Sequence, residues 1–234
     1  MKAVLFDLDD TLYPERTYVH SGFAAVAAFL ERATGNPAAA LLARLEQLHE
    51  RDGRGRLFDT LLGELEIHDP GRILTLACIH AYRAHTPRIA PFPDVPVTLQ
   101  SLRADGMLLG LVSDGMASVQ RRKLDALDGI AELLDVVVLT DELGHEHWKP
   151  SPLPFQIACA MLGVSCAEAV YVGNDPRKDF TGAKSAGLRT LRVGVPPQEG
   201  GTGVLNAGSL DDADAYVDPF AALPAAVRVA DAPV

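Results

Sequence analysis

Five short apolar runs, spread along the chain, constrain its fold more than any other feature of the sequence. They cover residues 3–6, 108–112, 136–139, 169–172 and 190–193. Each has the length of a strand. As a group they do not alternate between apolar and polar residues, which is typical of strands buried on both faces of a sheet.

Stretches with helical spacing separate these runs. Residues 118–127 follow the second run, 153–162 the third and 179–186 the fourth. Strands that alternate with helices favour a parallel sheet with helices on both faces. The sequence therefore predicts an α/β fold with a doubly wound, Rossmann-like parallel sheet.

The first and second runs are about a hundred residues apart, which is far longer than a simple crossover. Most of this gap has helical spacing, in residues 17–33, 37–50, 58–65 and 72–83. Four prolines then cluster at 87–96 and indicate a boundary. We expect residues 1–13 and 93–234 to form the core, with a loop at 196–203. Residues 14–92 are expected to form a helical insertion that folds over the edge of the sheet where a ligand would bind.

The charge and cysteine content narrow the possible partners and compartment. A net charge of −10 over 234 residues argues against nucleic acid or an anionic membrane as the main partner. Three cysteines without paired spacing indicate a reducing environment. Asp7 ends the first apolar run too early for a signal peptide. We therefore expect a cytoplasmic protein; its oligomeric state is not indicated.

Polar residues follow four of the predicted strands directly. They are Asp7 and Asp9 after the first run, Ser113, Asp114 and Gly115 after the second, Lys149 after the third, and Asn174, Asp175 and Asp179 after the fourth. The carboxyl ends of parallel strands lie at one edge of a sheet, where ligands bind. Two carboxylates two residues apart repel each other unless a cation lies nearby. This pattern predicts an enzyme that handles phosphate with a divalent cation.

These motifs resemble those of the haloacid dehalogenase-like superfamily. The first motif of that family is DxDxT, which here is Asp7-Leu8-Asp9-Asp10-Thr11. Ser113 matches the second motif and Lys149 the third, while an acidic cluster after the fourth strand matches the last. The helical insertion is similar to the type 1 cap of the phosphatase branch.

The resemblance implies a Mg²⁺-dependent phosphatase that hydrolyses a small phosphomonoester through an aspartyl-phosphate. The substrate would be a small phosphorylated metabolite, such as a nucleoside monophosphate or a sugar phosphate. Asp7 would be the nucleophile, and Asp9 the general acid and then the base. Lys149 would act beside Asp7. The resemblance also implies a set of phosphate-binding residues, namely Thr11, Ser113, Asp114, Gly115 and Lys149.

The metal would be held by Asp7, by the carbonyl of Asp9 and by one oxygen of the fourth motif. That motif commonly begins Gly-Asp, but here it reads Gly173-Asn174-Asp175. We expect Asp175 to bind the metal and Asp179 to orient its ligands or waters. Asn174 as the direct ligand is the alternative.

Other readings of the same residues stay open. A site of this kind also fits three other classes of protein: a phosphosugar mutase or other phosphotransferase, a 2-haloacid dehalogenase, and a weakly active phosphate-binding regulator. Two basic clusters lie outside these motifs. Residues 51–56 are either a loop that reads an anionic leaving group or a solvated linker. Residues 121–123, Arg-Arg-Lys, are expected to form a solvated helix face.

Overall fold

The computed structural model describes residues 1–193 and 213–230. The loop expected at 196–203 lies outside these residues. The chain divides into two compact units. The core unit consists of Met1–Pro14 and Ala90–Val234, and the helical unit of Glu15–Ile89. Among the described helices, none combines the length and the apolar character needed to cross a membrane.

The core unit is built on a parallel sheet with the strand order β3-β2-β1-β4-β5-β6. The strands are β1 (Ala3–Phe6), β2 (Leu108–Ser113), β3 (Val136–Leu139), β4 (Ala169–Gly173), β5 (Arg189–Arg192) and β6 (Ala215–Tyr216). All five predicted strands are present, and each end lies within one residue of its predicted position. Ala3 of β1 pairs with Leu108 on one side and Ala169 on the other. The prediction of a doubly wound parallel sheet is confirmed.

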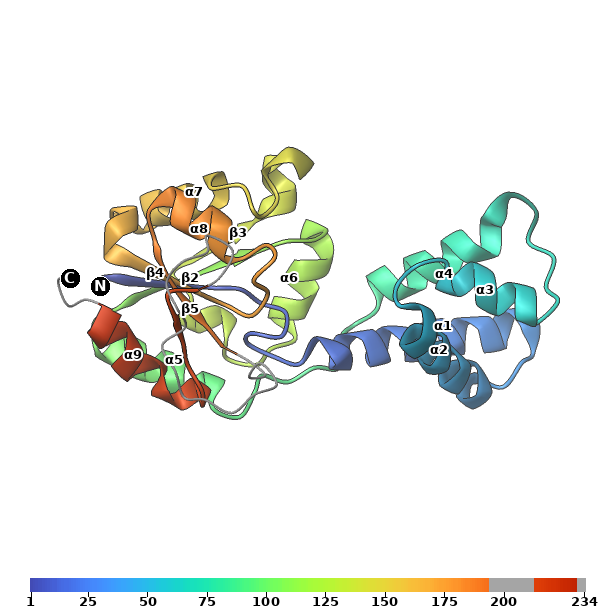
Figure 1. The fold of residues 1–234 in the computed structure, drawn as a ribbon. Helices are drawn as coiled ribbons and strands as arrows, with labels where there is room; N and C mark the ends of the chain where they lie inside the picture. The colour runs from blue at the N-terminus through green and yellow to red at the C-terminus, as the bar shows by residue number, and fades with distance from the viewer. Residues whose placement is uncertain (194–212, 231–234) are drawn as a thin grey trace. The chain divides into compact units, whose positions relative to one another are not determined.

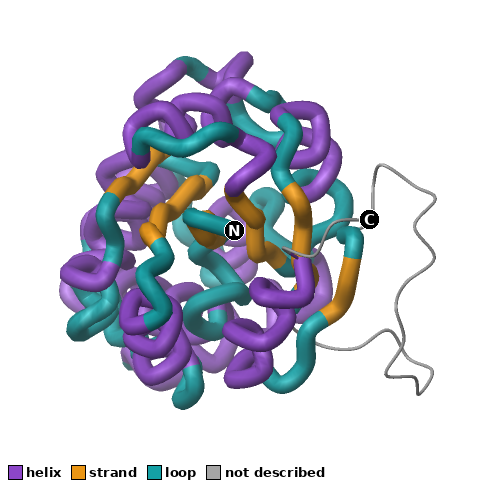
Figure 2. Tube along the Cα trace, turned by 90° about the vertical axis from the view of Figure 1, so that its left-hand side faces the viewer, coloured by secondary structure: helices purple, strands orange, loops and turns teal. Residues whose placement is uncertain are grey.

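Helices cover both faces of this sheet (Figures 1 and 2). They are α5 (Val95–Ala104), α6 (Ala117–Asp125), α7 (Leu153–Leu162), α8 (Phe180–Ala186) and α9 (Leu223–Ala230). In Figure 1, α7 and α8 lie on one side of the sheet and α5 and α9 on the other. Every residue of β1 and β4 is buried, as a sheet covered on both faces requires.

Helix α5 begins at the end of the proline-rich stretch, residues 87–96, which the sequence indicated only as a boundary. Pro96 occupies its first turn, where the missing N–H would have no intrahelical partner. Val95, Leu99 and Leu102 are buried at helical spacing. The last proline of the cluster thus begins a helix of the core that was not predicted from the sequence.

The strand order places a switch point at β1. The chain leaves β1 for β2 and β3 on one side and later returns to β4 on the other. The connections at the carboxyl ends of β1 and β4 therefore run in opposite directions, which leaves a crevice between them. Asp7 lies directly after β1, and Asn174 directly after β4.

The helical unit packs around its own apolar core. Its helices are α1 (Glu15–Thr34), α2 (Ala38–Asp52), α3 (Leu57–Glu64) and α4 (Ile73–Ala84), with a short 3₁₀ turn at Pro70–Arg72. All four predicted helical stretches are present. Helix α1 packs against α2 and α4. A Cβ atom at Gly22 would lie 2.5 Å from the ring of Tyr82, so the glycine allows α4 to approach α1 closely.

We expect Leu45→Ala to lower the free energy of unfolding by roughly 2–5 kcal/mol, because the side chain fills the core of the helical unit without any exposed surface. Leu76→Ala is the matched control in the same unit, since Leu76 is 59% exposed. Urea unfolding followed by far-UV circular dichroism measures both. Equal effects of the two substitutions would contradict the assigned core.

Candidate active site

A buried lysine joins three of the motifs at the carboxyl end of the sheet. The Nζ atom of Lys149, in the loop before α7, donates to Oδ1 of Asp7 at 2.6 Å and to Oδ1 of Asp179 at 2.9 Å. It also donates to the hydroxyl of Tyr171, on β4, at 2.9 Å. All four side chains are buried. Charge-assisted bonds of this kind are strong where water is excluded.

The charges of this cluster do not cancel. Burial raises the pKa of Asp7 to about 7, while the Lys149 ammonium acts in the opposite direction. Burial also disfavours the charged form of Lys149, but Asp179 and Asp7 hold its pKa well above the ordinary value. One ammonium therefore faces two carboxylates, and a further cation would relieve the excess negative charge.

Asp9 has a separate cationic partner. Both of its carboxylate oxygens lie 2.8 Å from Nζ of Lys123 on α6. Gln120 donates to Oδ2 at 3.1 Å, and the hydroxyl of Tyr13 donates to Oδ1. Burial alone would raise the pKa of Asp9, but Lys123 and these hydrogen bonds hold it below the ordinary value.

The expectation of a solvated helix face at residues 121–123 is wrong for Lys123. Arg121 and Arg122 are exposed, but Lys123 is only 4% exposed. Helical geometry places Lys123 one turn beyond Gln120, on the face that packs toward the strand ends. The signal in the sequence that could have identified Lys123 is its three-residue spacing from Gln120, on the helix that follows the second motif.

The residues after β2 contact two different parts of the core unit, helix α6 and the loop that carries Lys149. Oγ of Ser113 accepts a hydrogen bond from Nε2 of Gln120 at 2.7 Å. Oδ1 of Asp114 accepts from Oγ1 of Thr140 at 2.7 Å and from the backbone N–H of Lys149 at 3.1 Å. Asp114 thus holds the loop that carries the lysine. Gly115 follows with a φ of 110°, a conformation that strongly favours glycine.

Asp179 organises the loop after β4. Its Oδ2 atom accepts hydrogen bonds from the backbone N–H groups of Asn174 at 3.2 Å and Asp175 at 2.9 Å. Its Oδ1 atom binds Lys149 and the hydroxyl of Tyr171. Both oxygens of this carboxylate are therefore engaged by the protein.

The two candidate metal ligands of this loop differ in their contacts. Asp175 binds Arg177 through both of its oxygens, at 3.0 and 2.9 Å from the guanidinium. Oδ1 of Asn174 accepts one long hydrogen bond of 3.4 Å from the hydroxyl of Thr11. Asn174 is thus in contact with the first motif, which contains the nucleophile predicted from the sequence.

The donor atoms present fit a hard cation. Among the described residues, none donates a hydrogen bond to Oδ2 of Asp7, whose Oδ1 binds Lys149. The amide oxygen of Asn174 is only weakly engaged. Oxygen ligands and an uncompensated carboxylate are what Mg²⁺ requires. No group of three acidic, histidine or cysteine side chains is placed to hold a metal within the described part of the chain.

Three buried partners of the motifs were not predicted from the sequence. Gln120 and Lys123 lie on α6, and Tyr171 lies on β4 beside Lys149. A tyrosine within an apolar strand gives no local signal of a polar contact.

The basic cluster at residues 51–56 forms ion pairs within the helical unit. Arg51 pairs with Asp52, Arg54 with Glu15 and Arg56 with Asp59.

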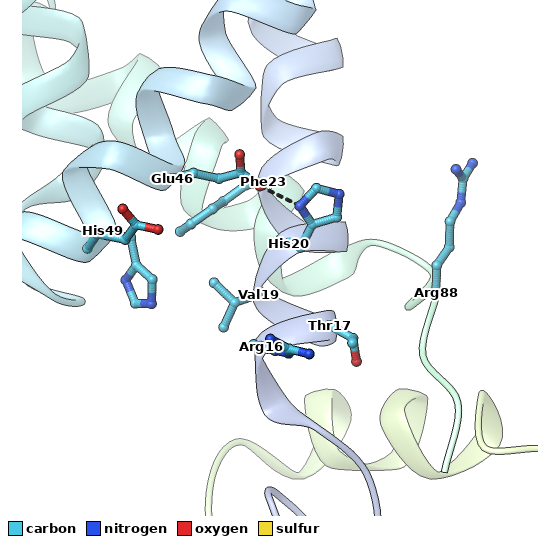
Figure 3. A pocket seen from close by; sticks show the side chains of 9 residues that line it. Arg16, Thr17, Val19, His20, Phe23, Glu46, His49 and Arg88 are labelled. Carbon is cyan, nitrogen blue, oxygen red and sulfur yellow. Dashed lines mark hydrogen bonds and ion pairs between the residues drawn. The ribbon is translucent and has the colours of Figure 1, made fainter. Parts of the chain in front are cut away.

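The helical unit contains a pocket of about 550 Å³ between α1 and α2 (Figure 3). Arg16, His20 and Phe23 contribute from α1, and Glu46 and His49 from α2. His20 pairs with Glu46 at 2.5 Å. Arg88, beyond α4, and Glu50 also line it, so the pocket carries charged groups of both signs. The sequence had not indicated this pocket.

Comparison with known proteins agrees with these motifs. A model of the hydrolase family "haloacid dehalogenase-like hydrolase" matches residues 1–187. A glyceraldehyde 3-phosphate phosphatase from Methanopyrus kandleri is 39% identical over 201 residues, which are 82% of this chain and 84% of that protein.

Two solved structures share the fold over nearly their whole length. A HAD phosphatase from Thermococcus onnurineus has a TM-score of 0.60 and 26% identity, covering 97% of this chain and 98% of that one. A 2-haloacid dehalogenase from Pseudomonas syringae has a TM-score of 0.65 and 27% identity, covering 99% and 100%. The fold thus accommodates two chemistries, and the site residues must distinguish them.

We expect Gly173→Ala to lower the free energy of unfolding by about 1–3 kcal/mol, because the new Cβ would lie 2.6 Å from the buried Oδ2 of Asp179. Gly63→Ala is the control, since it lies on α3 and no atom lies within 4 Å of the added Cβ. Urea unfolding compares the two variants. A Gly173→Ala protein as stable as the wild type would contradict the close packing of Asp179 against β4.

Proposed function

The chain belongs to the haloacid dehalogenase-like hydrolases, and on this basis we propose that it is a Mg²⁺-dependent phosphatase acting on a small phosphomonoester through an aspartyl-phosphate. One observation carries the proposal: Asp7 and Asp9, two residues apart, each bind a different buried lysine at the carboxyl end of the sheet. This arrangement gives a nucleophile and an acid–base group separate environments.

Asp7 is the proposed nucleophile. Its Oδ2 atom attacks the phosphorus and displaces the alcohol, so that hydrolysis of the aspartyl-phosphate by water becomes a second step. Lys149 holds the other oxygen and reduces the repulsion between the carboxylate and the anionic substrate. Asp179 and Tyr171 fix the position of the Lys149 ammonium.

Asp9 is the proposed general acid and base. In the first step it must hold a proton, against the lowered pKa that Lys123 imposes, and donate it to the leaving alcohol; in the second step it accepts a proton from the attacking water. Ser113 is a proposed donor to the phosphoryl oxygens. Because its oxygen accepts from the Gln120 amide, its own O–H group is available to donate.

Three more residues, Gly115, Asp114 and Thr11, have proposed roles in phosphate binding that rest on backbone conformation and on hydrogen bonds between loops. Gly115 adopts a φ of 110° that favours glycine, and Asp114 accepts a hydrogen bond from the backbone of Lys149 and so places its loop. Thr11 links the first motif to Asn174. These contacts support a role for the three residues in shaping the phosphate site.

Mg²⁺ would be held by Asp7, the carbonyl of Asp9 and one side chain of the loop after β4. When bound, it supplies positive charge to the phosphoryl group. The contact with Thr11 favours Asn174 as the ligand over Asp175, because Arg177 engages both oxygens of Asp175. Asp179 would act indirectly, by holding the backbone of both candidates.

The helical unit, residues 15–89, is proposed as the type 1 cap that selects the leaving group. The paired arginines of residues 51–56 argue for a structural role of that loop. Its pocket, which is lined by Arg16 and Arg88 and also by Glu46 and Glu50, is the better candidate for binding a polar leaving group. The substrate class is a small phosphorylated metabolite, as the name of the M. kandleri relative indicates for that protein.

A dehalogenase is the second candidate, because a 2-haloacid dehalogenase shares the fold. That chemistry uses the same nucleophile on carbon and needs neither a metal nor an acid at the second position. The elaborate binding of Asp9 by Lys123, Gln120 and Tyr13 favours the phosphatase. Chloride release from 2-haloacids that persists in EDTA would favour the dehalogenase instead.

Asp7→Asn should lower kcat/KM by more than about a thousandfold, because the amide cannot form the phosphoenzyme. A panel of phosphomonoesters with Mg²⁺ gives the rates, and acid quenching shows whether the protein carries the substrate's phosphate. Asp10→Asn is the control, since Asp10 is exposed and its φ of 53° tolerates asparagine. A turning-over Asp7→Asn protein would overturn the mechanism.

Removal of divalent cations by EDTA should abolish turnover, and Mg²⁺ should restore it. In Asn174→Ala, the Mg²⁺ concentration for half-maximal rate should rise roughly tenfold or more, because one oxygen ligand is lost. Asp175→Ala should change it less, since Arg177 holds that carboxylate. The opposite order of the two variants would assign the ligand to Asp175.

A further inference from the structure

Helix α6 presents two polar side chains to Asp9. Lys123 and Gln120 are three residues apart, and both are buried. The Lys123 ammonium lies 2.8 Å from each oxygen of Asp9, so it straddles the carboxylate. The side chain of Lys123 is 5% exposed, and that of Asp9 is 19% exposed.

Gln120 connects this carboxylate to the second motif. Its Nε2 atom donates to Oδ2 of Asp9 at 3.1 Å and to Oγ of Ser113 at 2.7 Å. The two hydrogens of one amide nitrogen thus fix the distance between the group proposed to protonate the leaving alcohol and the hydroxyl proposed to hold the phosphate. A rigid link of this kind is what a positioned acid requires.

We infer that Lys123 and Gln120 are positioning residues, which hold the Asp9 carboxylate in register with Ser113 so that it reaches the oxygen of the leaving group. The inference rests on the proposed phosphatase function and deepens it. Neither residue touches the substrate. Both act through Asp9, where together with the Tyr13 hydroxyl they restrict the rotation of the carboxylate.

The binding of Asp9 from α6 is separate from the buried cluster around Lys149. Lys149 binds Asp7 and Asp179, whereas Lys123 binds Asp9. Loss of Lys123 should therefore misplace the Asp9 carboxyl group and impair proton donation to the leaving group, even though it also removes a charge that lowers the pKa of Asp9. The nucleophile keeps its own partner. This separation predicts that a Lys123 variant loses more of its kcat/KM on substrates whose leaving group needs a proton than on substrates whose leaving group does not.

Two aryl phosphates of nearly the same shape make this measurable. The 4-nitrophenolate ion leaves readily without a proton, whereas the anion of phenol is a poorer leaving group and gains more from an acid. The value of kcat/KM reports the steps up to phosphoryl transfer, so the ratio of kcat/KM for 4-nitrophenyl phosphate to that for phenyl phosphate isolates proton donation.

In Lys123→Met, we expect this ratio to rise at least about tenfold, which is a modest part of the usual effect of a general acid. Gln120→Leu should raise it in the same direction and gives a second variant if the lysine substitution prevents folding. Arg122→Met is the matched control, because Arg122 is the exposed neighbour of Lys123 on α6. Its ratio should equal that of the wild type.

A double-mutant cycle separates positioning from general damage to the fold. In an Asp9→Asn background the acid is already lost, so Lys123→Met should leave the ratio unchanged. An unaltered ratio in both α6 variants, or an additive effect in the Asp9→Asn background, would overturn the inference. A wild-type protein that hydrolyses neither ester with Mg²⁺ would instead refute the proposed function and the inference with it.

Discussion

The core unit depends on a lysine buried among three polar partners. An ammonium group in an apolar interior is costly unless its charge is paired and its protons are bonded. The structure meets this requirement with Asp7, Asp179 and Tyr171, which come from three different elements. Any change in the packing of β1, β4 or α8 therefore alters the surroundings of Lys149. The positions of the sheet and its flanking helices are therefore constrained by the hydrogen bonds of Lys149 as well as by apolar packing.

This cluster also explains how two carboxylates can lie two residues apart at one strand end. Asp7 and Asp9 do not share a cation, because Lys149 approaches one and Lys123 the other. The two carboxyl groups consequently have opposite shifts of pKa: burial raises that of Asp7, whereas Lys123 and hydrogen bonds lower that of Asp9. A raised pKa favours the protonated form of Asp7 and a lowered pKa the ionised form of Asp9, so the proposed roles require a cation beside Asp7 and a proton delivered to Asp9.

The strands and the motif residues could be predicted because their signals are local. An apolar run identifies a buried strand, and the topology of a parallel sheet then brings its carboxyl end to the same edge as the others. The partners of the motifs could not be predicted in this way. Lys123 follows two exposed arginines, and only the rotation of α6 turns it inward. Helix α5 begins at the last proline of a cluster that indicated only a boundary. The contact of Asp179 with Tyr171 depends on packing between α8 and β4, which no local pattern reports.

The asparagine after β4 is consistent with the charge of this site. Lys149 already faces two carboxylates, and an aspartate at position 174 would add a third negative group near Asp7. An amide supplies an oxygen ligand without that charge. The carboxylate one residue later is neutralised by Arg177, and its backbone is held by Asp179. The order Asn174-Asp175 therefore limits the repulsion that an incoming phosphate meets, while it keeps an oxygen directed toward the first motif.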